Sequence, residues 1–153
     1  MRITVTNMKV NNVRKGAVLP PAIRITEEEL HRVSALASSC MELFPHVANF
    51  LAREMERATT VANEEDLHGA IRMGSKVTYR DEGTGITRDV FLVYPHEADI
   101  EFNRISILTP VGAALIGLSA GQRIEFQTPS SATRCISVLA VSEDRQVIDS
   151  PKK

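Results

Sequence analysis

Residues 103–141 read NRISILTPVGAALIGLSAGQRIEFQTPSSATRCISVLAV, and this stretch decides the fold of the chain. Ile105 and Ile107 alternate with polar residues, as in a β-strand. Pro110 fixes its own φ and disfavours helix in the residue before it, so a short helix is predicted to begin there and to run over residues 111–118. Alternation of polar and apolar residues over 123–127 and 134–141 predicts two more strands.

Small residues in the predicted helix favour close packing against a sheet. Gly112, Ala113 and Ala114 present little side-chain volume, and Gly117 or Gly121 can adopt the positive φ that ends the helix. In the last predicted strand, Ile136 and Val138 share one face, with Ala140 as a further candidate for that face. The stretch therefore predicts a strand, a short helix and a β-hairpin that enclose one apolar layer.

This pattern, from Ile105 through TPVGAALIG to the segment GQRI, resembles the C-terminal domain of the bacterial Gre transcription factors. It is most similar to the Rnk members of that family, which are called regulators of nucleoside diphosphate kinase. The resemblance extends upstream through residues 75–80 and 87–95 to a helical pair that begins near Pro21. It implies an α+β fold: a short N-terminal antiparallel helical hairpin (coiled coil), then an FKBP-like antiparallel β-sheet domain with one short helix.

The composition is that of an ordinary globular protein of 153 residues, 43% of them hydrophobic. No apolar run is long enough to span a bilayer, and the N-terminus lacks the apolar core of a secretion signal. Cys40 and Cys135 lie far apart in sequence, and we interpret them as free thiols in a reducing compartment. We therefore expect a cytoplasmic protein.

Charge is unevenly distributed, although the net charge is only −1. Residues 1–24 carry five basic side chains and no acidic ones, whereas residues 25–68 carry nine acidic and three basic ones. Such asymmetry indicates an interaction surface without identifying the partner. The basic N-terminal arm lacks aromatic residues for base stacking, so we favour a plain terminal extension over an arm that binds nucleic acid.

Two amphipathic helices are predicted before the β-rich part. Thr26 and Glu29 form a capping box for a helix over residues 27–39, and a second helix runs from Pro45 to about residue 59. Each helix has one apolar stripe, so the two should pack as an antiparallel hairpin. Further on, residues 75–80 and 87–94 alternate as strands on either side of an acidic, glycine-containing turn over residues 81–85.

These patterns predict five segments along the chain. They are a basic N-terminal extension (1–20), a helical hairpin (21–61), a linker (62–73), a GreA/GreB C-terminal-like domain of FKBP-like topology (74–146) and a tail (147–153).

The hairpin is much shorter than the coiled coil that the Gre resemblance implies. A helix of 13 residues extends about 20 Å, whereas the Gre coiled coil enters the polymerase secondary channel and presents acidic residues to the catalytic magnesium. The predicted tip consists of Cys40, Met41, Glu42, Leu43 and Phe44. Its single carboxylate is a poor site for Mg²⁺, which prefers several oxygen ligands. We therefore expect no transcript cleavage.

Other enzymatic interpretations have weak support. His31, His46, His68 and His96 fall in separate segments without ligand spacing, and we expect no metal and no cofactor. Glu64, Glu65, Asp66 and His68 are more easily explained as solvated linker residues than as a metal cluster. Cys40 and His46 could form a nucleophile and its base, but no orienting acid can be named. FKBP-type isomerases often carry a tryptophan in their pocket, and this chain has none. We therefore predict a protein that is not an enzyme.

A binding function remains. The resemblance implies docking on the rim helices of the β′ subunit of RNA polymerase, through Leu108, Thr109, Pro110 and Val111. Leu108 stands where Gre sequences can carry an acidic residue, which favours a more apolar contact. The alternative is that this segment only caps the helix and contacts no partner.

We expect a non-catalytic regulator that competes with Gre factors near the secondary-channel entrance, without direct sequence-specific binding of nucleic acid. The alternative is a regulatory protein with another partner, nucleoside diphosphate kinase for example, bound through the acidic hairpin. An enzyme that uses the concave sheet is the third and weakest interpretation.

Overall fold

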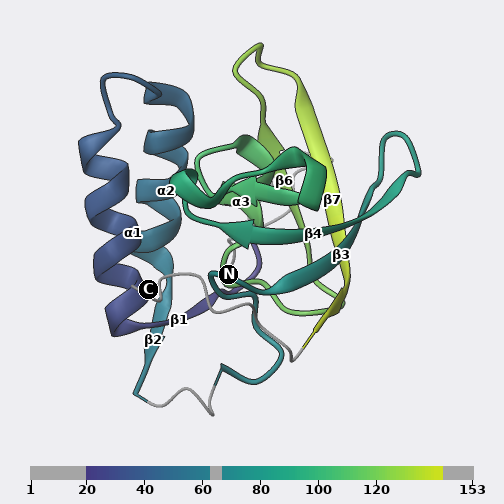
Figure 1. The fold of residues 1–153 in the computed structure, drawn as a ribbon, viewed down its shortest axis with the longest axis horizontal. Helices are drawn as coiled ribbons and strands as arrows, with labels where there is room; N and C mark the ends of the chain where they lie inside the picture. The colour runs from purple at the N-terminus through teal and green to yellow at the C-terminus, as the bar shows by residue number, and fades with distance from the viewer. Residues whose placement is uncertain (1–19, 63–66, 143–153) are drawn as a thin grey trace, which may run out of the picture.

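The structure is a computed structural model and describes residues 20–62 and 67–142. A helical hairpin lies on one side of a curled five-stranded sheet (Figure 1). The elements are, in chain order, β1 (Arg24–Thr26), α1 (Glu27–Ser39), α2 (Pro45–Arg57), β2 (Thr59–Val61), β3 (Lys76–Asp81), β4 (Thr87–Val93), η4 (Pro95–Glu97), η5 (Ile100–Phe102), β5 (Arg104–Ser106), α3 (Pro110–Leu115), β6 (Arg123–Gln127) and β7 (Thr133–Val141). The mixed helix and strand architecture confirms the α+β class. None of the described helices is long and apolar enough to cross a membrane.

The two helices of the hairpin form where capping and apolar periodicity predict them. The Thr26 hydroxyl accepts a hydrogen bond from the Glu29 backbone N–H at 3.1 Å, which starts α1 as the capping box predicts. Pro45 opens α2, which ends at Arg57, two residues earlier than predicted. It ends there because the chain turns extended to form β2, which pairs in parallel with β1.

The sheet has the strand order β5-β4-β3-β7-β6. Three of its four pairings are antiparallel, as predicted, and the β3–β4 turn is built on Asp81, whose carboxylate accepts from the Gly83 N–H at 2.9 Å. The edge strand β5 differs, because it runs parallel to β4. The prediction of a wholly antiparallel sheet was therefore wrong. The connection through η4 and η5 is long enough to carry the chain back before it enters β5.

Ala140, a candidate for the core face, does not face the core, because β7 contains a β-bulge. Tyr79 pairs with Val138 but Thr78 pairs with Ala140, so Leu139 is an extra residue in the strand. The inward and outward faces therefore exchange at this point. Ala140 is exposed, whereas Val141 packs against the core. Ile136 and Val138 face the core as predicted.

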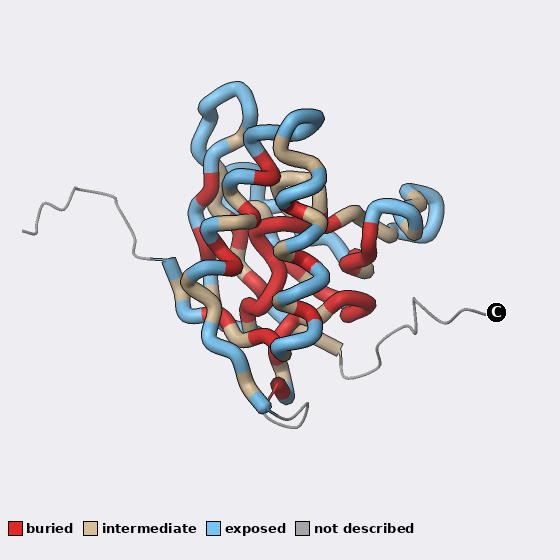
Figure 2. Tube along the Cα trace, turned by 90° about the vertical axis from the view of Figure 1, so that its left-hand side faces the viewer, coloured by how far each residue is buried: buried red, intermediate tan, exposed pale blue. Residues whose placement is uncertain are grey.

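The hairpin and the sheet share one hydrophobic core. Buried residues from α1, α2, the strands and α3 belong to a single cluster, and the tube in Figure 2 shows the buried stretches in the middle of the molecule with the turns exposed. Part of the segment predicted as a linker contributes to this core: Leu67, Ala70, Ile71 and Met73 are at most 5% exposed. Glu64, Glu65 and Asp66, which we interpret as solvated linker residues, lie outside the described residues, and the described His68 is exposed.

The helix α3 lies directly against the strand that precedes it. The Thr109 hydroxyl caps α3 by accepting from the Gly112 N–H at 3.0 Å. A Cβ on Gly112 would lie 2.2 Å from the Ser106 carbonyl oxygen, so only glycine permits this contact. The helix ends at Leu115, three residues before the predicted end, and Gly117 and Gly121 both adopt positive φ.

Candidate functional site

The structure brings the two predicted site segments together. An apolar groove with a volume of about 350 Å³ lies between the hairpin tip and the start of α3. Phe44 from the predicted tip and Leu108 and Pro110 from the predicted docking segment all line it. The two segments are separated by more than sixty residues in the chain, so only the tertiary fold makes them neighbours.

The remaining predicted site residues do not line the groove. Leu43 and Glu42 are exposed at the turn between α1 and α2, and Leu43 is 75% exposed. Cys40 and Met41 are half-buried at the end of α1. On the other side, Thr109 caps α3, and Val111 packs partly against the core.

Four lining residues were not among the predicted site residues. They are Pro45, His46 and Val47 at the start of α2, and Pro129 in the β6–β7 turn. The only signal in the sequence is that 126–133 lacks charged residues and contains a proline. That signal says nothing about where the turn lies in space.

Two contacts hold the hairpin tip over the sheet. His46 Nε2 lies 2.7 Å from the Gln127 carbonyl oxygen and donates to it, because the carbonyl can only accept. The rings of Phe50 and Phe126 lie 6.4 Å apart and are tilted by 52°, a favourable aromatic arrangement. The hydrogen bond to Gln127 occupies the Nε2 nitrogen of His46, and the Cys40 thiol contacts the Ser39 hydroxyl. The structure therefore adds no support to the Cys40–His46 nucleophile pair.

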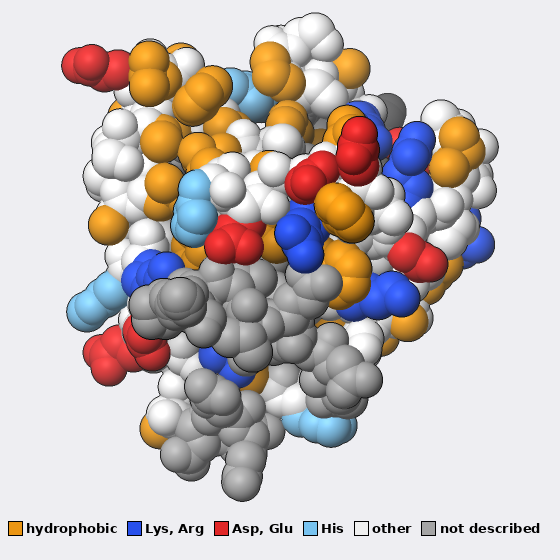
Figure 3. All heavy atoms as spheres, in the orientation of Figure 1, with side chains coloured by type: hydrophobic (Ala, Val, Ile, Leu, Met, Phe, Trp, Pro, Cys, Tyr) orange, Lys and Arg blue, Asp and Glu red, His pale blue; other side chains and the backbone are white. Residues whose placement is uncertain are grey.

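The surface around the groove is mostly apolar and uncharged. In Figure 3, hydrophobic side chains gather at the upper left, over the hairpin tip, and continue toward the top of the sheet. Lys and Arg side chains are instead concentrated in the middle and on the right of this face. The groove is thus suited to apolar recognition.

The described titratable groups with shifted pKa values lie on the sheet strands or in the β3–β4 turn. Arg134 donates to the Asp81 carboxylate at 2.6 Å and holds the pKa of that carboxyl below its usual range. Burial raises the pKa of Tyr79. None of these groups lines the groove, and the described residues include no group of three His, Cys, Asp or Glu side chains that could hold a metal.

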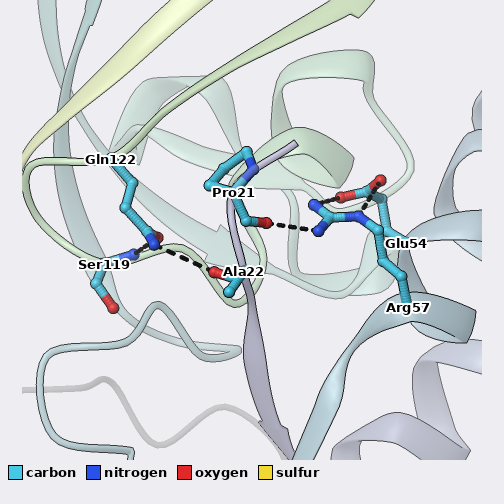
Figure 4. Close-up of polar contacts among 6 residues, drawn as sticks. All are labelled: Pro21, Ala22, Glu54, Arg57, Ser119 and Gln122. Carbon is cyan, nitrogen blue, oxygen red and sulfur yellow. Dashed lines mark hydrogen bonds and ion pairs between the residues drawn. The ribbon is translucent and has the colours of Figure 1, made fainter. Parts of the chain in front are cut away.

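The base of the hairpin combines the buried Ile23 and Ile25 with several polar contacts. Arg57 donates to both carboxylate oxygens of Glu54 and to the Pro21 carbonyl oxygen. Gln122 donates to the Ala22 carbonyl oxygen at 3.2 Å and accepts from the Ser119 N–H (Figure 4). Arg72 pairs with the buried Glu29 at 3.3 Å. These contacts fix the start of the hairpin against the sheet.

Comparison with known proteins assigns the family. The family model "Transcription elongation factor, GreA/GreB, C-term" matches residues 66–143. The "Regulator of nucleoside diphosphate kinase" of Escherichia coli (strain K12) is 31% identical over 119 residues, which are 78% of this chain and 88% of that protein. The transcription elongation factor GreA of Syntrophobacter fumaroxidans is 36% identical over 91 residues, which are 60% of this chain and 58% of that protein.

A solved structure agrees with these sequence relatives. The prokaryotic transcription elongation factor GreA/GreB from Nitrosomonas europaea superposes with a TM-score of 0.62 at 33% identity. The match covers 80% of this chain and 98% of that one, so it includes the hairpin as well as the sheet. The chain therefore belongs to the GreA/GreB family of transcription elongation factors.

Proposed function

We propose that this protein is a non-catalytic transcription regulator that binds RNA polymerase near the secondary-channel entrance, where it competes with Gre factors. The observation that carries the proposal is the apolar groove at the start of α3, in a chain of the GreA/GreB family. Leu108 and Pro110 line this groove, and the proposed contact is with the rim helices of the β′ subunit. Such a regulator acts in the cytoplasm.

The proposed lack of transcript cleavage follows from the hairpin. Each helix has 13 residues and so extends only about 20 Å. The hairpin also lies alongside the sheet, as Figure 1 shows, instead of projecting away from it. Glu42 is the only carboxylate in residues 40–44, whereas a protein Mg²⁺ site usually combines several oxygen ligands.

The finer structural assignments belong to the same proposal. We assign the curled sheet with α3 to the FKBP-like half-barrels and the hairpin to a shortened Gre coiled coil. The domain boundaries proposed are 21–61 for the hairpin and 74–146 for the sheet domain. Among the aromatic residues, Tyr94 and Phe126 are buried and Phe102 is 60% exposed, an arrangement that offers no support for an isomerase.

The first test is binding to core RNA polymerase with a Gre factor as competitor. We expect competition, and we expect the double variant Leu108→Asp with Pro110→Ala to bind at least about tenfold more weakly, a loss of about 1.4 kcal/mol. Because Leu108 packs partly against the core, melting curves must accompany the affinities. A control variant, Ile86→Asp, changes a 50% exposed residue in the β3–β4 turn and should bind normally.

Cleavage assays on backtracked complexes form the second test. We expect no stimulation by this protein at concentrations that saturate polymerase. Magnesium-dependent cleavage of the transcript would contradict the argument from hairpin length and tip composition.

A second candidate function follows from the relative named a regulator of nucleoside diphosphate kinase. In this alternative, the acidic hairpin binds the kinase or another protein partner. Glu27, Glu28, Glu42 and Glu56 are exposed and available for this role, whereas Glu29 and Glu54 are buried. A pull-down of purified kinase that is lost in Glu27→Lys with Glu28→Lys, combined with no binding to polymerase, would favour it.

A further inference from the structure

The hairpin tip contributes apolar residues to a groove that also contains the proposed docking segment. We propose that the tip forms the second wall of the polymerase-docking site, and that the groove accepts the apolar face of a partner α-helix. This inference rests on the proposed function and adds to it a role for the short hairpin. The tip binds the outside of the partner instead of entering a channel.

The exposure of the tip supports a binding role. Phe44 is 50% exposed and Leu43 is 75% exposed. Exposed apolar side chains of this size often mark a surface that is buried in a protein interface. Phe44, Pro45 and Val47 form one side of the groove, and Leu108, Pro110 and Pro129 form the other. The volume of about 350 Å³ is enough for one or two large apolar side chains.

The chemistry of the walls selects a helix as the occupant. Three of the lining residues are prolines, which have no backbone N–H to donate, and none of the lining residues lies in a β-strand, so the groove has no strand edge. An extended peptide that binds by strand addition needs such donors, whereas an α-helix satisfies its own backbone and inserts only side chains. The groove therefore favours an amphipathic helix with adjacent apolar residues.

The groove lining contains no Lys, Arg, Asp or Glu, and the exposed Glu42 of the tip is not part of that lining. Residues 43–52, 107–122 and 126–133 contain no Lys, Arg, Asp or Glu. His46 lies in the groove, but its Nε2 already donates to the Gln127 carbonyl oxygen. A charged residue of the partner placed in this groove would lose its hydration without gaining an ion pair. The inserted face is therefore apolar, and binding there depends little on salt.

The groove is formed before the partner arrives. The bond from His46 to Gln127 and the contact of Phe50 with Phe126 hold the tip over the end of β6. A preformed site avoids the entropic cost of ordering the hairpin during association.

The test measures polymerase affinity for variants of each wall. We expect Phe44→Ser to reduce affinity by about tenfold or more while the melting temperature stays close to that of the wild type, because Phe44 lines the groove and is 50% exposed. Ile86→Ser is the matched control, because Ile86 is also 50% exposed but lies in the β3–β4 turn. Its affinity should equal that of the wild type.

The outcomes separate this inference from the proposed function. If the wild type does not bind polymerase, both are wrong. If the wild type binds and Leu108→Asp weakens binding, but Phe44→Ser behaves like Ile86→Ser, the tip is not the second wall of the docking site and the proposed function stands. Affinity should change by less than about threefold between roughly 50 and 300 mM salt. A steep salt dependence would contradict the proposal that the apolar face of a helix occupies the groove.

Discussion

The base and the tip of the helical hairpin meet the sheet in opposite ways. At the base, residues 21–26 and 54–61 form a parallel strand pair, backbone bonds to the sheet domain and a partly buried ion pair between Glu54 and Arg57 (Figure 4). At the tip, residues 40–47 present exposed apolar side chains beside an open groove, with one hydrogen bond to Gln127. The base therefore sets the orientation of the hairpin, and the tip leaves apolar surface available for a partner.

The difference has a physical reason. Buried polar groups need well-placed partners, so polar contacts at the base tolerate only one geometry. Apolar contacts are less directional, so the tip can exchange water for a partner without rearranging the hairpin. Substitutions at the base should consequently change stability, and substitutions at the tip should change binding.

The largest effect on stability is expected for Gly117→Ala at the base. Gly117 has φ +82°, and a Cβ there would lie 2.7 Å from Ile23 Cβ, so the variant combines backbone strain with a clash. We expect a loss of about 3 to 4 kcal/mol in the free energy of unfolding, measured by urea denaturation. Gly85→Ala is the control, because Gly85 has φ +77° with no atom within 4 Å of its Cβ position. Equal losses for the two variants would show that the base is loosely packed.

The next effect concerns the buried ion pair between the hairpin and the segment before β3. Arg72→Met leaves the Glu29 carboxylate without this cation, and the two side chains are 12% and 9% exposed. We expect a loss of about 3 kcal/mol by denaturation at pH 7. Arg80→Met, which breaks an exposed pair with Glu82, should cost less than about 1 kcal/mol. A loss below 1 kcal/mol for Arg72→Met would mean that other contacts of the base, and not this ion pair, hold the hairpin in place.

A smaller effect is expected at the tip. His46→Ala removes the bond to the Gln127 carbonyl oxygen, which is an exposed contact. We expect a loss of about 1 kcal/mol or less in stability, because solvent can replace the lost donor. Polymerase affinity should nevertheless fall, since the preformed groove loses a hydrogen bond that holds one of its walls. A large loss of stability with unchanged affinity would reverse the roles assigned to base and tip.

The smallest effect is expected outside both contacts, at Asp81. Its folded-state pKa is lowered, first by the hydrogen bond from Arg134, so the carboxylate stabilises the fold above its unfolded-state pKa of about 4. This contribution is lost as the pH falls through the folded-state pKa. The stability difference between wild type and Asp81→Asn should therefore be constant above about pH 5 and shrink in more acidic solution. Denaturation curves from pH 7 to pH 2 measure it, and a difference that persists at pH 2 would contradict this assignment.

Local patterns predicted most of the elements. The capping residues Thr26 and Thr109, and the prolines at positions 45 and 110, set the starts of the three helices. The alternation in residues 123–127 predicted β6 with its observed bounds and its buried Ile124 and Phe126. These signals depend on residues a few positions apart, which is why the sequence alone contains them.

Long-range pairings were beyond such reasoning. Strands β1 and β2 have three residues each, too few for a recognisable alternation, and they exist because they pair with each other. The parallel β4–β5 pair and the bulge at Leu139 depend on neighbouring strands in the same way. Leu67, Ala70, Ile71 and Met73 are buried although they lie in the segment predicted as a linker, and Ile71 and Met73 belong to the same core cluster as residues of the hairpin and the sheet.

The sequence by itself determined the helical hairpin, the β-rich C-terminal part, the family resemblance and the two separate segments expected to bind. It did so because caps, prolines and hydrophobic periodicity act over short distances along the chain. Only the tertiary structure decided that Phe44 lies across a groove from Leu108 and Pro110, and that Arg72 reaches Glu29. Those contacts depend on the angle at which the hairpin packs on the sheet. That angle is set by the buried base, whose residues are distant in sequence.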